Sequence, residues 1–192
     1  MTRRRTALLR AAALLLAAGS AVAAPVTYDI DPDHTRVWWE VRHFATSTQR
    51  GRFDDIAGLI VLDREKARGE VSIRIATASV SSGVPALDRM LRSDHFLASD
   101  AHPEAWFVAG RVSFDGDRLG AVRGEFTLRG VSRPLELRAL RFACRHDEAR
   151  HHEVCGGDFE AEFRRSDHGS TFGLPFVGDT VRLLIAVEGV ER

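Results

Sequence analysis

The sequence predicts an all-β domain of about eight antiparallel strands, with one short helix inserted between the third and fourth strands. Two observations carry this prediction. Apolar and polar residues alternate in short runs separated by glycine and aspartate, which is typical of antiparallel strands with one buried face. One stretch between the third and fourth runs follows a helical period instead.

Eight runs carry the strand pattern. In the first run, Val37, Trp39 and Val41 share one face of an extended chain, because successive side chains alternate between two faces. The third run repeats this with Val71 and Ile73. The runs cover residues 35–44, 51–62, 69–78, 104–114, 122–128, 135–143, 156–163 and 181–187.

The helical stretch covers residues 85–96 (PALDRMLRSDHF) and contains no β-branched residue. Leu87, Met90 and Leu91 recur at helical spacing, and Pro85 suits the first turn of a helix, where its missing N–H costs nothing. We therefore expect a short helix here, between two strands of the sheet.

Eight antiparallel strands can be arranged in two ways. Closing the sheet into a barrel removes the exposed edge strands, and an eight-stranded barrel is just wide enough to pack side chains or hold one ligand. A sandwich of two sheets has the same strand signature. Periodicity alone leaves both arrangements open.

Residues 1–23 have the order of segments expected of a cleavable secretory signal. Arg3, Arg4, Arg5 and Arg10 give a positive start, an apolar stretch follows, and Ala21-Val22-Ala23 offers small residues for the peptidase. The alternative is a short buried helix. The signal interpretation divides the chain into residues 1–23, the signal peptide, and residues 24–192, one exported domain.

The charge of the exported domain disfavours nucleic acid as a partner. The signal segment holds four arginines and no acidic residue, so residues 24–192 hold 23 basic residues against 27 acidic ones, a formal charge of −4. Proteins that bind nucleic acid depend on neutralising phosphates with basic side chains. We therefore expect no nucleic-acid partner.

Two cysteines, Cys144 and Cys155, are separated by ten residues. An even number of cysteines in an exported chain favours a disulfide bond, and this spacing suits a bridge across a hairpin. The alternative is a pair of free thiols.

Six short motifs resemble, in order and at compatible spacing, the YceI-like family of periplasmic polyisoprenoid-binding proteins with a lipocalin-like barrel. The resemblance covers about residues 27–190, and its strongest part is GEFTLRGVSRPL at residues 124–135. Gln49, Leu97 and His168 depart from the family pattern. The motifs are residues 31–43 (DPDHTRVWWEVRH), Ser47 with 51–53, 91–96 with 102–103, 124–135, Cys144 with 155–159, and 164–169 with 177–181.

The resemblance implies an eight-stranded antiparallel lipocalin-like barrel in the periplasm that carries a polyisoprenoid or another long-chain lipid. The lipid tail would enter an apolar cavity, and the short helix would cover one opening. Arg164 and Arg165 are the candidates for binding the head group, with ion pairing to Glu160 or Glu162 as the alternative. The candidate cavity residues are Val37, Trp39, Val41, Phe53, Val71, Ile73, Ile75, Met90, Phe96, Phe126 and Leu128.

Two other function classes remain as hypotheses. The first is a stress-related structural or interaction barrel whose interior is filled by side chains and holds no lipid. The second is a hydrolase or metal protein that uses His146, His151 and His152, which cluster between the cysteines. Because no nucleophile elbow or phosphate-binding loop is present, we expect no catalytic site and no cofactor. The clustered histidines lie at an expected hairpin tip, which is usually mobile and exposed, so we expect no metal site. The sequence leaves a homodimer open.

Overall fold

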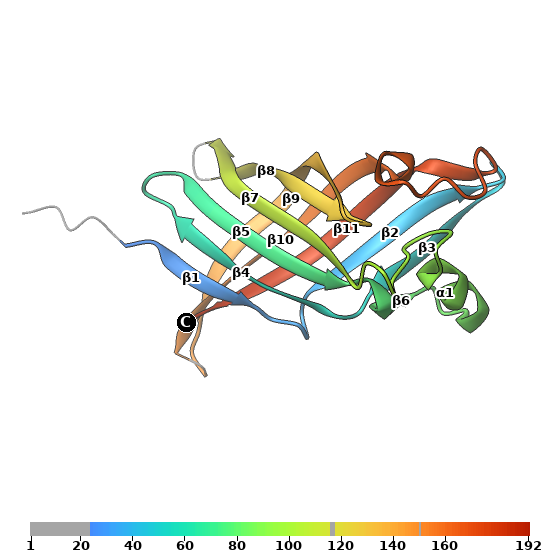
Figure 1. Ribbon diagram of the computed structural model, residues 1–192. Coiled ribbons are helices and arrows are strands. Elements are labelled where there is room, and N and C mark those ends of the chain that lie inside the picture. The colour runs from blue at the N-terminus through green and yellow to red at the C-terminus, as the bar shows by residue number, and fades with distance from the viewer. Residues whose placement is uncertain (1–23, 116–117, 150) are drawn as a thin grey trace, which may run out of the picture.

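The computed structural model describes residues 24–115, 118–149 and 151–192, and the predicted signal segment lies outside them. The described chain forms one helix, two 3₁₀ turns and a single antiparallel sheet (Figure 1). The strands are β1 (Val26–Ile30), β2 (Arg36–His43), β3 (Ser47–Phe53), β4 (Ile56–Asp63), β5 (Arg68–Ala76), β6 (Val80–Ser81), β7 (Glu104–Asp115), β8 (Arg118–Leu128), β9 (Val131–Asp147), β10 (His152–Arg164) and β11 (Val177–Glu191). The helical elements are η1 (Thr77–Ser79), α1 (Pro85–Arg92) and η2 (Arg165–His168).

The sheet closes into a barrel. Strands β1, β4, β5, β7, β8, β9, β10 and β11 pair in that order, and β1 then pairs with the end of β11, with Tyr28 opposite Glu191. The prediction of an all-β barrel is therefore confirmed, and the sandwich alternative is wrong. Among the described strands, the pairing of β1 with β11 closes the sheet, so neither strand is an unpaired edge there.

Three of the eight barrel strands are bent into two segments each. Strand β11 pairs with β1 near its C-terminal end and with β2 along its first half. In the same way, β4 pairs with β1 and β3 pairs with β2, so β3 and β4 are two segments of one bent strand. The segments β5 and β6 in turn pair with β4 and β3. Counting β1–β2, β3–β4 and β5–β6 as bent strands gives the predicted eight, with α1 between the third and fourth.

The bends open one end of the barrel. At this end, β6 pairs with β3 and forms no ladder with β7, within the part of the chain that the structure describes. Helix α1 and the segment that follows it lie in the resulting gap (Figure 1). We call this end of the barrel the mouth.

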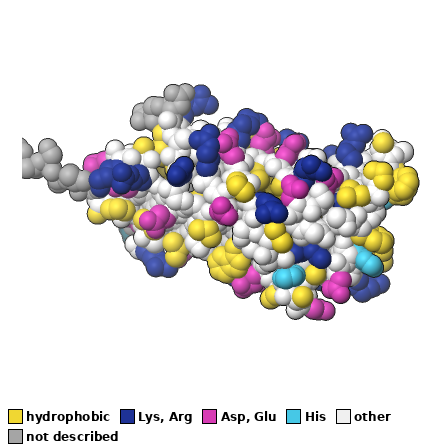
Figure 2. Space-filling view, turned by 45° about the horizontal axis from the view of Figure 1, so that its top comes forward, with side chains coloured by type: hydrophobic (Ala, Val, Ile, Leu, Met, Phe, Trp, Pro, Cys, Tyr) yellow, Lys and Arg dark blue, Asp and Glu magenta, His cyan; other side chains and the backbone are white. Residues whose placement is uncertain are grey.

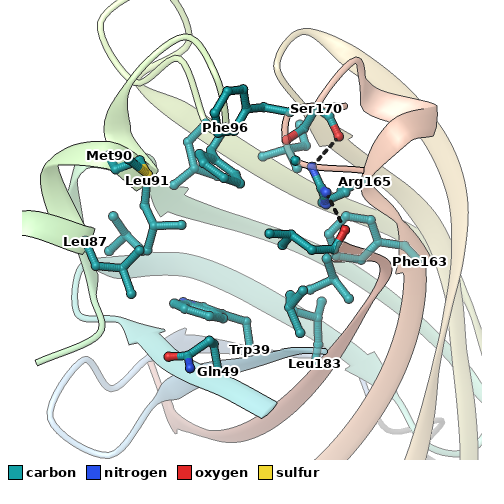
Figure 3. A pocket seen from close by; sticks show the side chains of 18 of the residues that line it. Trp39, Gln49, Leu87, Met90, Leu91, Phe96, Phe163, Arg165, Ser170 and Leu183 are labelled. Carbon is teal, nitrogen blue, oxygen red and sulfur yellow. Dashed lines mark hydrogen bonds between the residues drawn. The ribbon is translucent and has the colours of Figure 1, made fainter. Parts of the chain in front are cut away.

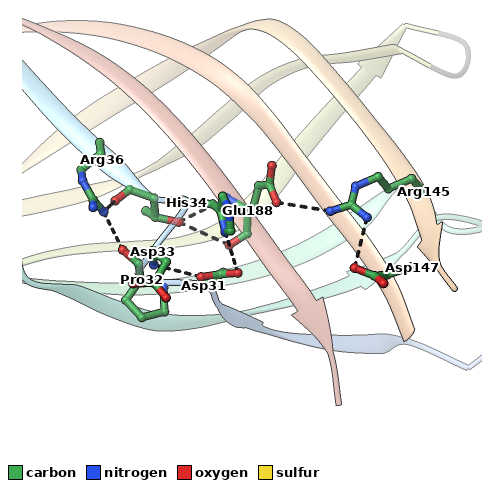
Figure 4. Close-up of polar contacts among 9 residues, drawn as sticks. Asp31, Pro32, Asp33, His34, Arg36, Arg145, Asp147 and Glu188 are labelled. Carbon is green, nitrogen blue, oxygen red and sulfur yellow. Dashed lines mark hydrogen bonds and ion pairs between the residues drawn. The ribbon is translucent and has the colours of Figure 1, made fainter. Parts of the chain in front are cut away.

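The connection from β1 to β2 ties the first bend to β11 (Figure 4). The amide of Asp31 donates to the carbonyl oxygen of Glu188 (2.9 Å), and the Thr35 hydroxyl and the Glu188 backbone are within hydrogen-bond distance in both directions. The carboxylate of Asp31 accepts the Asp33 amide and contacts the His34 ring, both at 2.9 Å. The motif that opens the family resemblance thus holds the strand where its direction changes.

Away from the mouth the barrel interior is filled by side chains. Val71, Phe107, Val122 and Phe159 are buried there together, and Ile73 packs against them. Interiors of this kind reach the packing density of organic crystals, so this half of the barrel provides rigidity rather than space. The hypothesis of a packed barrel therefore describes this half of the molecule.

Element boundaries differ from the prediction in several places, and the last four strands, β8 to β11, extend beyond the predicted runs. Strand β1 was not expected, and the predicted run 51–62 is interrupted at the bend between β3 and β4. The helix ends at Arg92 rather than at residue 96, because Ser93 adopts an extended conformation and its hydroxyl donates to the carbonyl oxygen of Met90 (2.7 Å). A helix that could cross a membrane is not found among the described residues.

The predicted disulfide is confirmed. Cys144 and Cys155 lie directly opposite each other on β9 and β10, and their sulfur atoms are bonded. Beside the bridge, Glu153 accepts hydrogen bonds from the hydroxyl of Tyr28 and the guanidinium of Arg64. Burial, together with the bond to Glu153, raises the pKa of Tyr28 to about 12.

Candidate functional site

A cavity of about 540 Å³ lies inside the mouth of the barrel (Figure 3). Helix α1 forms one wall, strands β2 and β3 form the floor, and Phe163 and Arg165 lie on the opposite side (Figure 3). Its volume falls in the range of roughly 300–1,000 Å³ that is typical of small-molecule sites.

Helix α1 is amphipathic and presents its apolar face to the cavity. Leu87, Met90 and Leu91 line it because helical residues three and four apart share one side. Asp88 anchors the helix to the end of β6, since its carboxylate accepts the Ser82 amide (2.7 Å) and hydroxyl (2.6 Å). These bonds to Ser82 lower the pKa of Asp88, so the anchor is an ionised carboxylate at neutral pH.

Trp39 covers the floor of the cavity. Strand alternation points Val37, Trp39 and Val41 inward from β2, and all three line the cavity. Opposite Trp39 on β3 stands Gly51, where a Cβ atom would lie 2.3 Å from Cζ2 of the indole. The absence of a side chain at Gly51 therefore allows the ring to lie against β3.

Most of the predicted cavity residues come together here. The cavity is lined by Val37, Trp39, Val41, Phe53, Ile75, Met90, Phe96, Phe126 and Leu128. Two predicted residues, Val71 and Ile73, do not line it. Both belong to the packed part of the interior, because they lie farther along β5 from the mouth than Ile75.

The two candidate head-group arginines have different environments. Arg165 is 4% exposed and lines the cavity. Its guanidinium donates to three carbonyl oxygens, those of Val177 and Ser170 at 2.9 Å and of Gly178 at 2.8 Å. Burial lowers the pKa of Arg165, as expected for a cation removed from water.

Arg164 points away from the cavity. It is exposed, its Nε lies 2.8 Å from the carboxylate of Asp179, and it does not line the cavity. The expected alternative partners are not used, because Glu160 pairs with Arg138 and Arg182 instead. The structure therefore separates the two arginines that the sequence placed together.

Several lining residues were not predicted. Phe44 lies in the turn between β2 and β3, and Phe172 and Phe176 lie in the loop that precedes β11. The usable signal was the presence of large aromatic residues in short segments rich in Gly, Ser and Thr, where loops normally carry small polar side chains. Gln49, noted as a departure from the family pattern, also lines the cavity.

The charged side chains that line the cavity are arginines. Arg42 and Arg165 are present, and the described lining contains no carboxylate. The other polar side chains are those of His43, Gln49 and Ser170. An apolar interior with a few polar groups is the composition that holds an apolar ligand and fixes its orientation.

Other parts of the surface suit this chemistry less well. A second hollow of about 700 Å³ near the β4–β5 and β7–β8 turns is lined by charged residues that include Asp63, Arg68, Glu70, Arg111 and Arg123. His146, His151 and His152 of the β9–β10 hairpin belong to no group of three metal ligands found in the described residues. One such group consists of Cys144, Glu153 and Cys155, whose sulfurs are joined in the disulfide.

Comparison with known sequences identifies the family. The model of the YceI-like domain matches residues 28–189. The chain belongs to the YceI-like family. It is 32% identical over 185 residues to a UPF0312 protein of Pectobacterium atrosepticum, covering 96% of this chain and 95% of that protein. It is also 32% identical over 182 residues to protein YceI of Escherichia coli O157:H7, covering 94% of each chain.

Several solved structures share the fold. BcnA of Burkholderia cenocepacia superposes with a TM-score of 0.68 at 18% identity, over 83% of this chain and 98% of its own. A YceI protein of Campylobacter jejuni gives 0.67 at 24% identity, over 79% and 90%. A polyisoprenoid-binding domain from Saccharophagus degradans gives 0.62 at 16% identity, over 87% and 99%. At these identities the comparison establishes the barrel architecture.

Proposed function

We propose that the protein is a periplasmic binding and carrier protein for a long-chain amphiphile, specifically a polyisoprenoid lipid. The observation that carries the proposal is the apolar cavity, which opens at the mouth between α1 and the β2–β3 turn. A hydrocarbon tail held there loses contact with water, and each buried Å² of apolar surface contributes about 25 cal/mol.

The head group of the ligand would lie beside Arg165. The three carbonyl oxygens that accept its hydrogen bonds are neutral, so its positive charge has no carboxylate partner at the cavity wall. Arg42 adds a second positive charge to the lining. Arg164 is not part of this proposal, because its guanidinium is paired with Asp179 outside the cavity.

The proposed location rests on the signal peptide expected at residues 1–23 and on the disulfide. A bond between Cys144 and Cys155 persists in an oxidising compartment, and a water-insoluble lipid needs a carrier to cross an aqueous one. The description of the Saccharophagus relative as polyisoprenoid-binding supports the same class of ligand. We propose a binding function without catalysis.

Native mass spectrometry of protein exported to a bacterial periplasm tests the proposal. We expect a co-purifying lipid on the wild type and a reduced amount on Val41→Trp, because the larger side chain fills part of the cavity. The matched control is Leu140→Trp, which adds the same side chain at an exposed position outside the cavity. A bare wild-type mass, or equal loss of lipid in both variants, would contradict the proposal.

A further inference from the structure

Large apolar side chains are exposed around the mouth. Eight such residues are exposed in the described chain, and four of them also line the cavity. These four, Phe44, Met90, Phe172 and Phe176, are between 47% and 61% exposed. Figure 2 shows apolar side chains gathered at the end of the molecule where the β2–β3 turn and α1 lie. The apolar surface therefore continues from the cavity to the outside, beside the polar side chains of Arg42, His43 and Gln49 in the lining.

One aromatic pair projects from the β2–β3 turn. Phe44 and Phe176 stack with their ring centroids 5.4 Å apart, and the Phe44 amide donates to the Phe176 carbonyl oxygen at 2.6 Å. Phe44 has a φ of 49°, a conformation that is unusual for a bulky residue. The backbone thus holds an aromatic ring in water at a conformational cost, which is a feature associated with functional surfaces.

A second aromatic group lies at the same opening. Phe172 stacks on the ring of His95 at 4.4 Å and meets the edge of Phe96 at 5.6 Å. These contacts join the loop before β11 to the segment after α1. We call the four exposed residues that line the cavity, Phe44, Met90, Phe172 and Phe176, the aromatic rim, since three of them are aromatic.

The charge around the aromatic rim is positive, although the exported domain is acidic. The segments that supply this part of the cavity wall, residues 41–49, 87–97 and 163–177, hold five arginines and three aspartates. Arg164 is paired with Asp179 outside these segments, which leaves four arginines against the three aspartates. Arg42 lies two residues before Phe44 and lines the cavity with it, and Arg89 precedes Met90 in α1. Neither guanidinium forms an ion pair with a carboxylate of the described residues. The rim is therefore complementary to a surface that is apolar inside and anionic outside.

We propose that the aromatic rim docks onto the surface of an anionic lipid bilayer, an inference that rests on the proposed lipid-carrier function. The exposed rings enter the interfacial region, and Arg42 and Arg89 contact lipid phosphates. Each basic residue near an anionic surface adds to the electrostatic attraction. In this orientation the mouth faces the bilayer, so a lipid tail passes between membrane and cavity without crossing water.

Vesicle flotation with the protein purified after export of the full chain tests the docking. We expect binding to vesicles of phosphatidylethanolamine and phosphatidylglycerol and weaker binding to phosphatidylcholine vesicles. The double variant Phe44→Ser/Phe176→Ser should lower the partition coefficient by about tenfold or more, because two exposed rings are lost. Arg89→Glu should weaken binding to the anionic vesicles alone, while Leu140→Ser on the outer barrel wall should leave binding unchanged.

Three results would overturn the docking. The first is a wild type that does not float with anionic vesicles. The second is a loss of binding in Leu140→Ser equal to that in the double variant. The third is an ultracentrifugation profile in which the double substitution converts a dimer to a monomer while vesicle binding persists. The last result would assign the rim to a second copy of the chain. A wild type that takes up lipid supplied in cyclodextrin but does not float refutes the docking and leaves the proposed function intact. A wild type that floats with vesicles but does not take up lipid supports the docking and refutes the proposed function.

Discussion

The indole of Trp39 lies directly against Gly51, its partner across the β2–β3 ladder. A Cβ atom on Gly51 would stand 2.3 Å from Cζ2 of the ring and 2.5 Å from the carbonyl oxygen of Ser81. Trp39 is 7% exposed and forms part of the cavity floor. The shape of the floor therefore depends on a position that has no side chain.

Replacing Gly51 with alanine should move the indole. Because neither the ring nor the β6 backbone can give way without repacking, we expect Gly51→Ala to cost about 1–3 kcal/mol of unfolding free energy and to weaken lipid binding. Urea denaturation and lipid titration measure the two effects. Gly110→Ala is the matched control, because a Cβ there meets nothing within 4 Å. Equal stability of both variants would show that Trp39 does not need this gap.

The chain contains a single tyrosine, so the ionisation of Tyr28 can be followed directly by ultraviolet absorbance. Its pKa is raised from 10.0 to about 12 by burial and by the bond to Glu153. The folded state thus favours the neutral phenol, and this contribution to stability is fully present below pH 10 and is lost as the pH rises toward 12. In Glu153→Gln we expect a lower Tyr28 pKa than in the wild type. Phenolate formation near pH 10 in the folded protein would contradict this assignment.

The two neighbouring arginines should differ in their effects on stability. Arg165→Met leaves three carbonyl oxygens without their donor, and we expect a loss of about 3 kcal/mol. Arg164→Gln removes one exposed ion pair with Asp179, which solvent screens, and should cost much less than the change at Arg165. Chemical denaturation of both variants measures the difference. Similar losses would mean that Arg165 does not fasten the loop before β11.

The disulfide should stabilise the β9–β10 hairpin by limiting the unfolded chain. Replacing both Cys144 and Cys155 with serine is expected to lower the free energy of unfolding by about 3 kcal/mol in the chain-entropy model. Thermal denaturation with and without a reducing agent provides the control, because the reductant should destabilise the wild type and leave the double variant unchanged. A reductant-insensitive wild type would show that the bond contributes little.

Strand periodicity predicted which face of each strand turns inward, but not how deep each residue lies. Trp39, Ile75 and Phe126 have the inward orientation expected from alternation, and they line the cavity. Val71 and Ile73 also turn inward but lie in the packed half. Alternation has a period of two along every strand, so it carries no information about the position of the mouth.

The mouth was the least predictable part of the site. Phe44, Phe172 and Phe176 lie in turns, where no repeat assigns a face to a side chain. The bends that open the barrel depend on contacts between distant segments, such as Asp31 with Glu188, which local propensity does not reveal. Arg164 and Arg165 are adjacent in sequence, yet they differ in environment because η2 begins between them. Arg164 pairs with Asp179 on the surface, and Arg165 is buried.

The central claim is that the cavity inside the mouth holds a lipid tail. Photo-crosslinking with a polyprenyl phosphate that carries a diazirine at the end of its tail tests this claim most directly, with peptide mass spectrometry locating the adduct. We expect the label on cavity residues such as Trp39, Met90 or Leu183, and competition by unlabelled lipid. Labelling confined to outer residues such as Leu140, or labelling that unlabelled lipid does not reduce, would contradict the account.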